Sequence, residues 1–276
     1  MSCELPFFSC VIPVKGERPF IKDALASLDA QGIGDELEII VQDGDVDSRV
    51  ERADRAEEVG DVRWFREEDL GQSDALNKGF AKAKGEWLFW LNADDVLLPG
   101  ALKKVRELIG RAERVDRVDW IAGDTVYIDA QGKVKEVRCD AKWRPWFGKK
   151  LSVWTGGPSA FFRRALWEKH GGFDTDLKYV MDIELWTRWA KAGEKFAALG
   201  DYVWGFREHG GSKTGSGANR DAQLDECARV DARHGVSSGG FWRNVTRAAS
   251  VLDGSWSKRC ADGRRLKGML WGEVKS

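Results

Sequence analysis

Two hydrophobic periods alternate along the first part of the chain, and they predict strands separated by helices. Short apolar runs are typical of buried strands, and they lie at Phe8–Val14, Leu37–Val41, Val62–Phe65 and Trp87–Leu91, the last of which is continuously apolar. Between them, apolar residues at helical spacing predict helices at Phe20–Leu28, Ser73–Lys84 and Pro99–Ile109, and a charged, solvated helix at Val50–Val59. This order predicts a mostly parallel sheet with helices on both faces.

The pattern changes after residue 118. Trp120 to Arg138 predicts two strands around the turn 129–132, followed by a short strand at Ala160–Phe162 and an amphipathic helix at Met181–Ala192. No internal repeat or linker marks a second large domain. We therefore expect one domain over residues 1–240 and a helical extension over 241–276.

Composition and charge exclude several classes of protein. The chain has 276 residues and a formal net charge of −1, which argues against binding nucleic acid by bulk electrostatics. No apolar run approaches the ~20 residues needed to span a bilayer, and the N-terminus lacks the pattern of a secretion signal. None of the five cysteines forms a CxxC pair, so we expect no structural zinc and no disulfide framework. A cytoplasmic location fits best.

Acidic residues follow two of the predicted strands at the edge where an open α/β sheet binds its ligands. One strand runs into Asp43, and another into Asn92, Asp94 and Asp95. Carboxylates next to a buried strand suit a hard divalent cation such as Mg²⁺, which takes one or two of them together with substrate phosphates. The alternative is that Asp94 and Asp95 only cap the helix that follows.

The start of the third predicted helix has the features of an anion site. Residues 69–79 combine a glycine with small polar side chains, and free N–H groups at a helix start favour a diphosphate. The alternative is that Ser73 or Asp74 is a plain N-cap.

The helix at Met181–Ala192 places one acid differently from the others. Asp182 lies on the same face as Leu185, Trp186 and Trp189, at the first turn. Partial burial and the helix dipole act on its pKa in opposite directions, and a carboxylate poised in this way suits a general base. The alternative is a simple acid at a helix N-terminus. On the other face, the spacing of Glu184 and Arg188 predicts a solvated ion pair.

The residues from Arg207 to Thr214 predict a flexible clamp for phosphate or metal, since His209 and Lys213 lie there among glycines and hydroxyls. His170 and His234 are expected at the surface without a role. Three tryptophans lie in predicted loops where sugar rings could stack: Trp143, Trp146 and Trp154.

Several of these motifs together resemble the family 2 glycosyltransferases of the GT-A fold, most closely those that build bacterial surface polysaccharides. The resemblance covers roughly residues 7–215. Its segments are Gly71–Gly79, Trp90–Asp95 with Pro99-Gly100, Gly156–Pro158 with Phe161–Arg164, Gly171–Asp174 and Met181–Trp186. Asn92 stands where the family has the first acid of its DxD element. The resemblance implies an α/β GT-A fold with a mixed acceptor-side region.

The resemblance also implies a function and roles for individual residues. The function is inverting, metal-dependent hexosyl transfer from a nucleoside-diphosphate sugar, most readily a UDP-sugar, to a glycan or lipid-linked acceptor. Asp182 would be the catalytic base, and Asp94 and His209 would bind Mg²⁺ or Mn²⁺. The residues expected to bind the donor are Pro13, Asp43, Gln72, Ser73, Asp74, Asn77, Asn92 and Lys213.

Two other functions and one surface remain open. A sugar-phosphate nucleotidyltransferase would need a glycine-rich basic loop after the first strand, of which Lys15 and Arg18 form only a faint version. A noncatalytic nucleotide-sugar binding module would need no base. The extension carries eight Lys or Arg against three acids, with Trp242, Trp256 and Trp271 interspersed. It either contacts the anionic inner membrane surface peripherally or packs on the catalytic domain.

Overall fold

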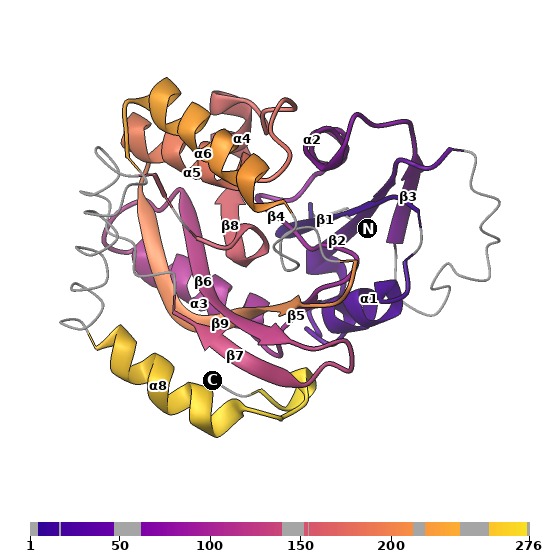
Figure 1. Ribbon diagram of the computed structural model, residues 1–276, viewed down its shortest axis with the longest axis vertical. Coiled ribbons are helices and arrows are strands. Elements are labelled where there is room, and N and C mark those ends of the chain that lie inside the picture. The colour runs from indigo at the N-terminus through magenta and orange to yellow at the C-terminus, as the bar shows by residue number, and fades with distance from the viewer. Residues whose placement is uncertain are drawn as a thin grey trace.

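The computed structural model describes residues 5–16, 18–46, 62–139, 152–153, 155–211, 219–237 and 254–274. Within these residues nine strands form one sheet, in the order β3-β2-β1-β4-β8-β6-β9-β5, with β7 paired to β6 (Figure 1). The strands are β1 (Phe8–Val14), β2 (Leu37–Asp43), β3 (Val62–Arg66), β4 (Trp87–Trp90), β5 (Val96–Leu97), β6 (Trp120–Ile128), β7 (Val134–Arg138), β8 (Ala160–Arg163) and β9 (Phe196–Arg207). The helices are α1 (Ile21–Asp29), α2 (Gln72–Phe80), α3 (Ala101–Ala112), α4 (Arg164–His170), α5 (Met181–Ala192), α6 (Arg220–His234) and α8 (Ser255–Leu266).

The first half of the sheet is wholly parallel, as the sequence predicts. β1 pairs with β2 and with β4, and β2 pairs with β3, all in parallel register. The chain moves outward from β1 to β3 and then returns to place β4 on the other side of β1. This reversal leaves a crevice at the carboxyl ends of β1 and β4, where doubly wound sheets bind their ligands.

Alternate residues of the central strands support two separate cores. Cys10 and Ile12 of β1 pack with the apolar sides of α1 and α3, whereas Val11 packs with α2, α4 and α5 on the opposite face. All three side chains are fully buried. The alternation follows from the two-residue period of a strand. Because both faces of the central strands are buried, their sequences are mostly apolar and not alternating.

The second half of the sheet is mixed, and the C-terminal residues pack on it. β8 runs antiparallel to β4 and β6, while β9 is parallel to β6. Leu266 of α8 is buried in a cluster with Val137 and Tyr202, and Lys258 Nζ lies 3.3 Å from the buried carboxylate of Asp124. Residues 254–274 therefore pack on the mixed half of the sheet, and membrane contact stays a prediction. No helix in the described ranges is both long and apolar enough to cross a bilayer.

The bounds of α2 and α3 differ from the predicted ones. α2 ends at Phe80 rather than Lys84, because the chain must turn toward β1: Gly85 lies against Ser9 so closely that a Cβ atom would be 2.6 Å from its backbone nitrogen. α3 begins at Ala101, after Gly100 with a φ of 72°. The predicted helix at 50–59 and the tryptophans Trp143, Trp146, Trp154 and Trp242 lie outside the described residues.

A pair of glycine substitutions tests the packing of α2 on β1. A Cβ atom at Gly79 would lie 2.4 Å from Val11 Cγ1, whereas a Cβ atom at Gly110 of α3 would meet nothing within 4 Å. We expect Gly79→Ala to lower the free energy of unfolding by about 1–3 kcal/mol through overpacking. Gly110→Ala should raise it by about 0.5–1 kcal/mol through helix propensity. Urea denaturation measures both changes, and equal shifts of the two variants would contradict this close approach.

Candidate active site

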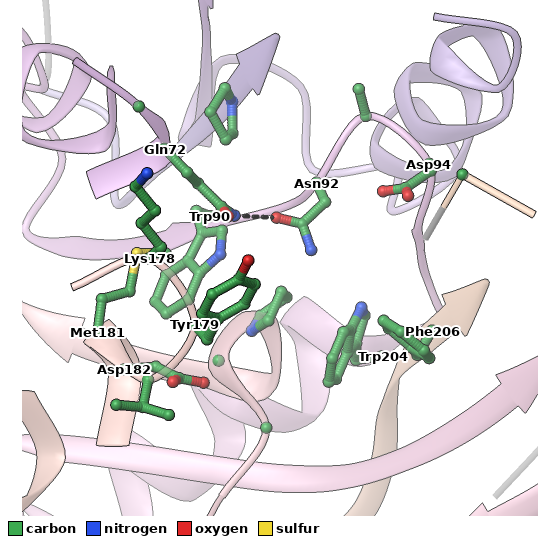
Figure 2. Close-up of a pocket in the computed structure, with 18 of the residues that line it drawn as sticks. Gln72, Trp90, Asn92, Asp94, Lys178, Tyr179, Met181, Asp182, Trp204 and Phe206 are labelled. Atoms are coloured by element: carbon green, nitrogen blue, oxygen red, sulfur yellow. Dashed lines mark hydrogen bonds between the residues drawn. The ribbon is translucent and has the colours of Figure 1, made fainter. Parts of the chain in front are cut away.

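A cavity of about 960 Å³ opens at the crevice between β1 and β4. Its walls come from the ends of β1 and β4, the start of α2, the first turn of α5, and the segment after β9 (Figure 2). It brings together six of the residues predicted from the sequence: Pro13, Gln72, Asn92, Asp94, Asp182 and His209. Segments far apart in the chain thus meet at one site, where the sheet topology predicts a ligand.

Asp94 and His209 lie side by side in this cavity, 115 positions apart in the chain. His209 Nε2 is 3.0 Å from Asp94 Oδ2, and the Asp94 side chain is 36% exposed, so both groups are open to a ligand. The carboxylate oxygen is a suitable donor for Mg²⁺ or Mn²⁺, whereas imidazole nitrogen favours a transition-metal ion over Mg²⁺. The described part of the chain contains no group of three or more acidic, His or Cys residues able to hold a metal. The remaining ligands of an ion here would therefore come from substrate and water.

The loop that carries Asp94 is held by its neighbours in the chain. Asn92 Nδ2 donates a hydrogen bond to Asp95 Oδ2 at 2.7 Å, and Gln72 Nε2 donates to Asn92 Oδ1 at 2.8 Å (Figure 2). Asn92 therefore links the start of α2 to this loop, a role for which an amide with both donor and acceptor atoms is suited. Asp95 is completely buried and accepts the backbone N–H of Arg207 at 2.8 Å. Its burial, with a further contribution from the Asp94 charge, raises the pKa of Asp95 well above its usual value.

Arg207 joins this loop to β9 and to α1. Its side chain is 1% exposed, and its guanidinium donates to the backbone oxygen of Asp94 at 2.8 Å and to Asp23 Oδ2 at 2.8 Å. The guanidinium also lies 4.5 Å from the ring centroid of Phe20, whose ring is 5.1 Å from that of His209. Arg207 thus fixes the Asp94 backbone and the strand end from which His209 follows.

Asp182 lies in the first turn of α5 and reaches the cavity next to Gly157. Its Oδ1 accepts the backbone N–H of Ile183 at 2.9 Å. A Cβ atom at Gly157 would be 3.0 Å from Asp182 Oδ2 and 2.4 Å from Trp90, so any side chain there would crowd the carboxylate. Burial raises the pKa of the Cys227 thiol to about 11, and nearby carboxylates, including that of Asp182, contribute to the increase. Asp182 is half-buried, as expected for a carboxylate on the apolar face of a helix.

Three predicted donor-binding residues of α2 are directed to the protein instead of the cavity. Ser73 Oγ donates to the backbone oxygen of Leu177, and Asn77 makes two hydrogen bonds to the backbone of Phe173. Asp74 accepts from the backbone N–H of Leu70 and from Lys78, whose ammonium lowers the pKa of Asp74. These side chains fix α2, so a diphosphate would meet the backbone of Gly71 and Gln72, which line the cavity.

Asp43 is placed behind the cavity wall and is paired with an arginine. It is 1% exposed, and Arg18 Nη2 donates to its two carboxylate oxygens at 3.0 and 2.9 Å. Arg18 lines the cavity, whereas Asp43 does not. The donor contact expected for Asp43 therefore remains a prediction that requires this pair to open. Lys213 lies outside the described residues.

The polar face of α5 differs from the sequence prediction. Glu184 and Arg188 form the expected ion pair at 2.6 Å, but Glu184 is only 3% exposed and Arg188 25%, so the carboxylate is buried and the pair is only partly solvated. His234 accounts for this burial, since its Nε2 lies 2.9 Å from Glu184 Oε1 and joins α6 to α5. His234 thus has a structural role that its position near a helix end did not indicate.

Sequence reasoning missed other residues that shape the site. Arg207 was noted only as part of a basic segment, although its position just before His209 was a usable signal. Glu226 of α6 and Thr125 of β6 gave no local signal, because they reach the site only through tertiary packing.

Comparison with known proteins gives one family match and many similar chains. A family model described as glycosyl transferase family 2 matches residues 9–168. An uncharacterised glycosyltransferase of Rickettsia typhi is 24% identical over 200 residues, which are 69% of this chain and 61% of the relative. The chain therefore spans about three fifths of that relative's length.

Two solved structures share the fold. TarS 1–349 of S. aureus in complex with UDP-GlcNAc has a TM-score of 0.63 at 18% identity, covering 82% of this chain and 65% of that one. A mannosyltransferase from Pyrobaculum calidifontis in complex with GDP-Man and Mn²⁺ has a TM-score of 0.59 at 23% identity, covering 83% and 64%. At these identities the likeness concerns the fold alone.

Proposed function

The chain belongs to glycosyl transferase family 2, and from this premise we propose that it transfers a sugar from a nucleoside-diphosphate sugar to an acceptor hydroxyl, with inversion at the anomeric carbon. The observation that carries the proposal is the joint placement of Asp182, Asp94 and His209 on the walls of one cavity. A single displacement needs a base for the acceptor on one side and a charge-stabilising group for the leaving diphosphate on the other.

In the proposed reaction, the Asp182 carboxylate accepts the proton of the acceptor hydroxyl as that oxygen bonds to the anomeric carbon. The bond between the anomeric carbon and the diphosphate oxygen breaks, and the nucleoside diphosphate leaves with the electron pair. Backbone N–H groups at the start of α2 favour a diphosphate there. Gln72 and Asn92, which are bonded to each other, line the cavity between α2 and Asp94.

Asp94 and His209 would hold the divalent cation, Mg²⁺ or Mn²⁺; a carboxylate suits either ion, and an imidazole beside it favours Mn²⁺. Such an ion, when bound, supplies positive charge to the leaving diphosphate. A UDP-sugar is the proposed donor. Support comes from the mannosyltransferase and TarS structures, which hold GDP-Man with Mn²⁺ and UDP-GlcNAc, respectively.

An Asp94→Ala variant tests the metal site. We expect it to weaken Mn²⁺-dependent binding of UDP by about 10- to 100-fold, because one of two protein ligands is lost. Isothermal calorimetry with and without Mn²⁺ measures the change, and Asp176→Asn, at an exposed position outside the cavity, provides the matched control. Equal UDP affinity of Asp94→Ala and the wild type in Mn²⁺ would rule out this ligand.

A donor screen tests the reaction class. We expect slow release of nucleoside diphosphate from at least one nucleotide sugar in the presence of Mn²⁺. A sugar-phosphate nucleotidyltransferase would instead release pyrophosphate from a nucleoside triphosphate and a sugar phosphate, and a binding module would release neither. Lys15 and Arg18, the basic residues that the nucleotidyltransferase reaction would use, are paired with Asp69 and Asp43. The structure thus offers no unpaired lysine or arginine at these two positions for a triphosphate.

A further inference from the structure

One face of strands β9, β6 and β7 lines the cavity, and the reaction proposed above does not involve this face. Trp204 lies opposite Thr125, and Thr125 lies opposite Arg138, which forms a row across the three strands. In the next row Phe206 lies opposite Tyr127. Residues two apart on a strand share a face, and all five side chains line the cavity. We call these five residues the β9–β6–β7 face.

The rings of this face form a continuous aromatic surface that ends at a cation. Phe206 stands edge-on to Trp204 at 5.3 Å and to Tyr127 at 5.2 Å between ring centroids. The Arg138 guanidinium lies 4.5 Å from the Tyr127 ring centroid, and its side chain is 46% exposed. Phe206 and Tyr127 are half-buried, so parts of their rings are open. Apolar ring faces beside a multiple N–H donor suit a saccharide, which has C–H faces and hydroxyl acceptors.

Two adjacent glycines connect this face to the proposed base. A Cβ atom at Gly156 would lie 2.5 Å from the Trp204 ring, and one at Gly157 would lie 3.0 Å from Asp182 Oδ2. Consecutive Cα atoms are about 3.8 Å apart. Gly156 and Gly157 therefore form a floor without side chains, with Trp204 next to Gly156, and with Asp182 and Trp90 next to Gly157. Figure 2 labels Trp90, Asp182 and Trp204 around this part of the cavity.

Hydrogen-bonding capacity is left unused directly beneath the face. The hydroxyls of Thr125 and Thr155 and the indole N–H of Trp90 are buried and have no hydrogen-bond partner among the described residues. All three residues line the cavity. These three atoms have almost no accessible surface, so they form a polar layer beneath the cavity floor and do not themselves contact a ligand.

We propose that the β9–β6–β7 face binds a sugar ring of the acceptor, so that the acceptor is a glycoside and not a simple alcohol. This rests on the proposed function, because Asp182 must face the acceptor. The donor is expected at Pro13, Gln72 and Asp94, at the carboxyl ends of the parallel strands, whereas this face belongs to the mixed half of the sheet. The acceptor ring lies along the half-buried rings of Tyr127 and Phe206, and its reacting hydroxyl passes over Gly156 and Gly157 toward Asp182.

Variants of the two most open rings test this subsite. Tyr127→Leu and Phe206→Leu keep an apolar side chain but remove the aromatic face. The matched control is Phe65→Leu on β3, also a half-buried strand aromatic next to cations, with Arg63 and Lys82 at 5.1 and 5.0 Å from its ring centroid, but outside the cavity. The probes are methyl α- and β-glycosides of glucose, galactose, mannose and N-acetylglucosamine. Their binding is measured by saturation-transfer NMR with UDP and Mg²⁺ present.

We expect at least one methyl glycoside to bind the wild type, and each cavity variant to raise its dissociation constant about tenfold, while Phe65→Leu leaves it unchanged. Loss of binding in Phe65→Leu as well, or equal binding by all four proteins, would overturn the proposal, as would failure of every probe to bind the wild type. The measurement needs no turnover, so it is separate from the donor screen. Ring-dependent binding without release of nucleoside diphosphate would refute the proposed reaction and leave the saccharide site in place.

Discussion

Replacement of Asp182 by asparagine is expected to lower the turnover of sugar transfer about 10²- to 10⁴-fold, because an amide cannot accept the acceptor proton. The side-chain volume is kept, and the amide oxygen can still accept the N–H of Ile183. The fold and the affinity for the donor should therefore remain. Initial rates with saturating acceptor measure turnover, and UDP titration in Mn²⁺ measures donor binding.

The matched control for this substitution is Asp176→Asn, on the loop that precedes α5. Asp176 is exposed and does not line the cavity, so its loss of charge should change turnover less than twofold. A fall in turnover that is shared by both variants would point to general electrostatics. Full activity of Asp182→Asn would show that another group removes the proton.

Much of the parallel half of the fold could be predicted because its signals are local. Phe8–Val14 and Met181–Ala192 match β1 and α5 to the residue, since an apolar run and an amphipathic period each end at a clear change of pattern. α6 could not be found in this way. Most of its residues are polar or charged, and in this helix only Glu226, Cys227 and Val230 are buried, so the helix has no clear apolar stripe.

The same difference between local signals and tertiary packing applies to the residues of the candidate site. Asp94, Asp182 and His209 belong to motifs that can be read along the chain, and the structure places all three in one cavity. Ser73 and Asn77 belong to such a motif as well, but their side chains bond to backbone groups more than ninety positions away. A motif therefore identified the segment, while the direction of each side chain depended on packing that no local pattern encodes.

Glu226 supplies a second large expected effect, because it holds the segment that leads into Asp182. Its buried carboxylate accepts three consecutive backbone N–H groups, from Lys178, Tyr179 and Val180, at 2.9, 2.8 and 3.2 Å. α5 has no side-chain cap at Val180, the residue before its first turn. Glu226 therefore fixes, from another helix, the segment that enters α5, and its carboxylate lies next to the helix start, where a negative charge is stabilising.

We expect Glu226→Ala to lower turnover about 10- to 100-fold, because small displacements of a catalytic group cost this much, while the Michaelis constant for the donor changes little. Glu226→Gln should recover part of the turnover, since its amide oxygen still accepts N–H groups. Asp225→Asn, on the exposed side of the same helix, is the matched control. Rates are compared well below the melting temperature of each variant, with the folded fraction checked by circular dichroism. Turnover within twofold of wild type in folded Glu226→Ala would mean that α5 holds Asp182 in place without the three hydrogen bonds to Glu226. A proportional change in both kinetic constants would indicate a general loss of structure rather than a displaced base.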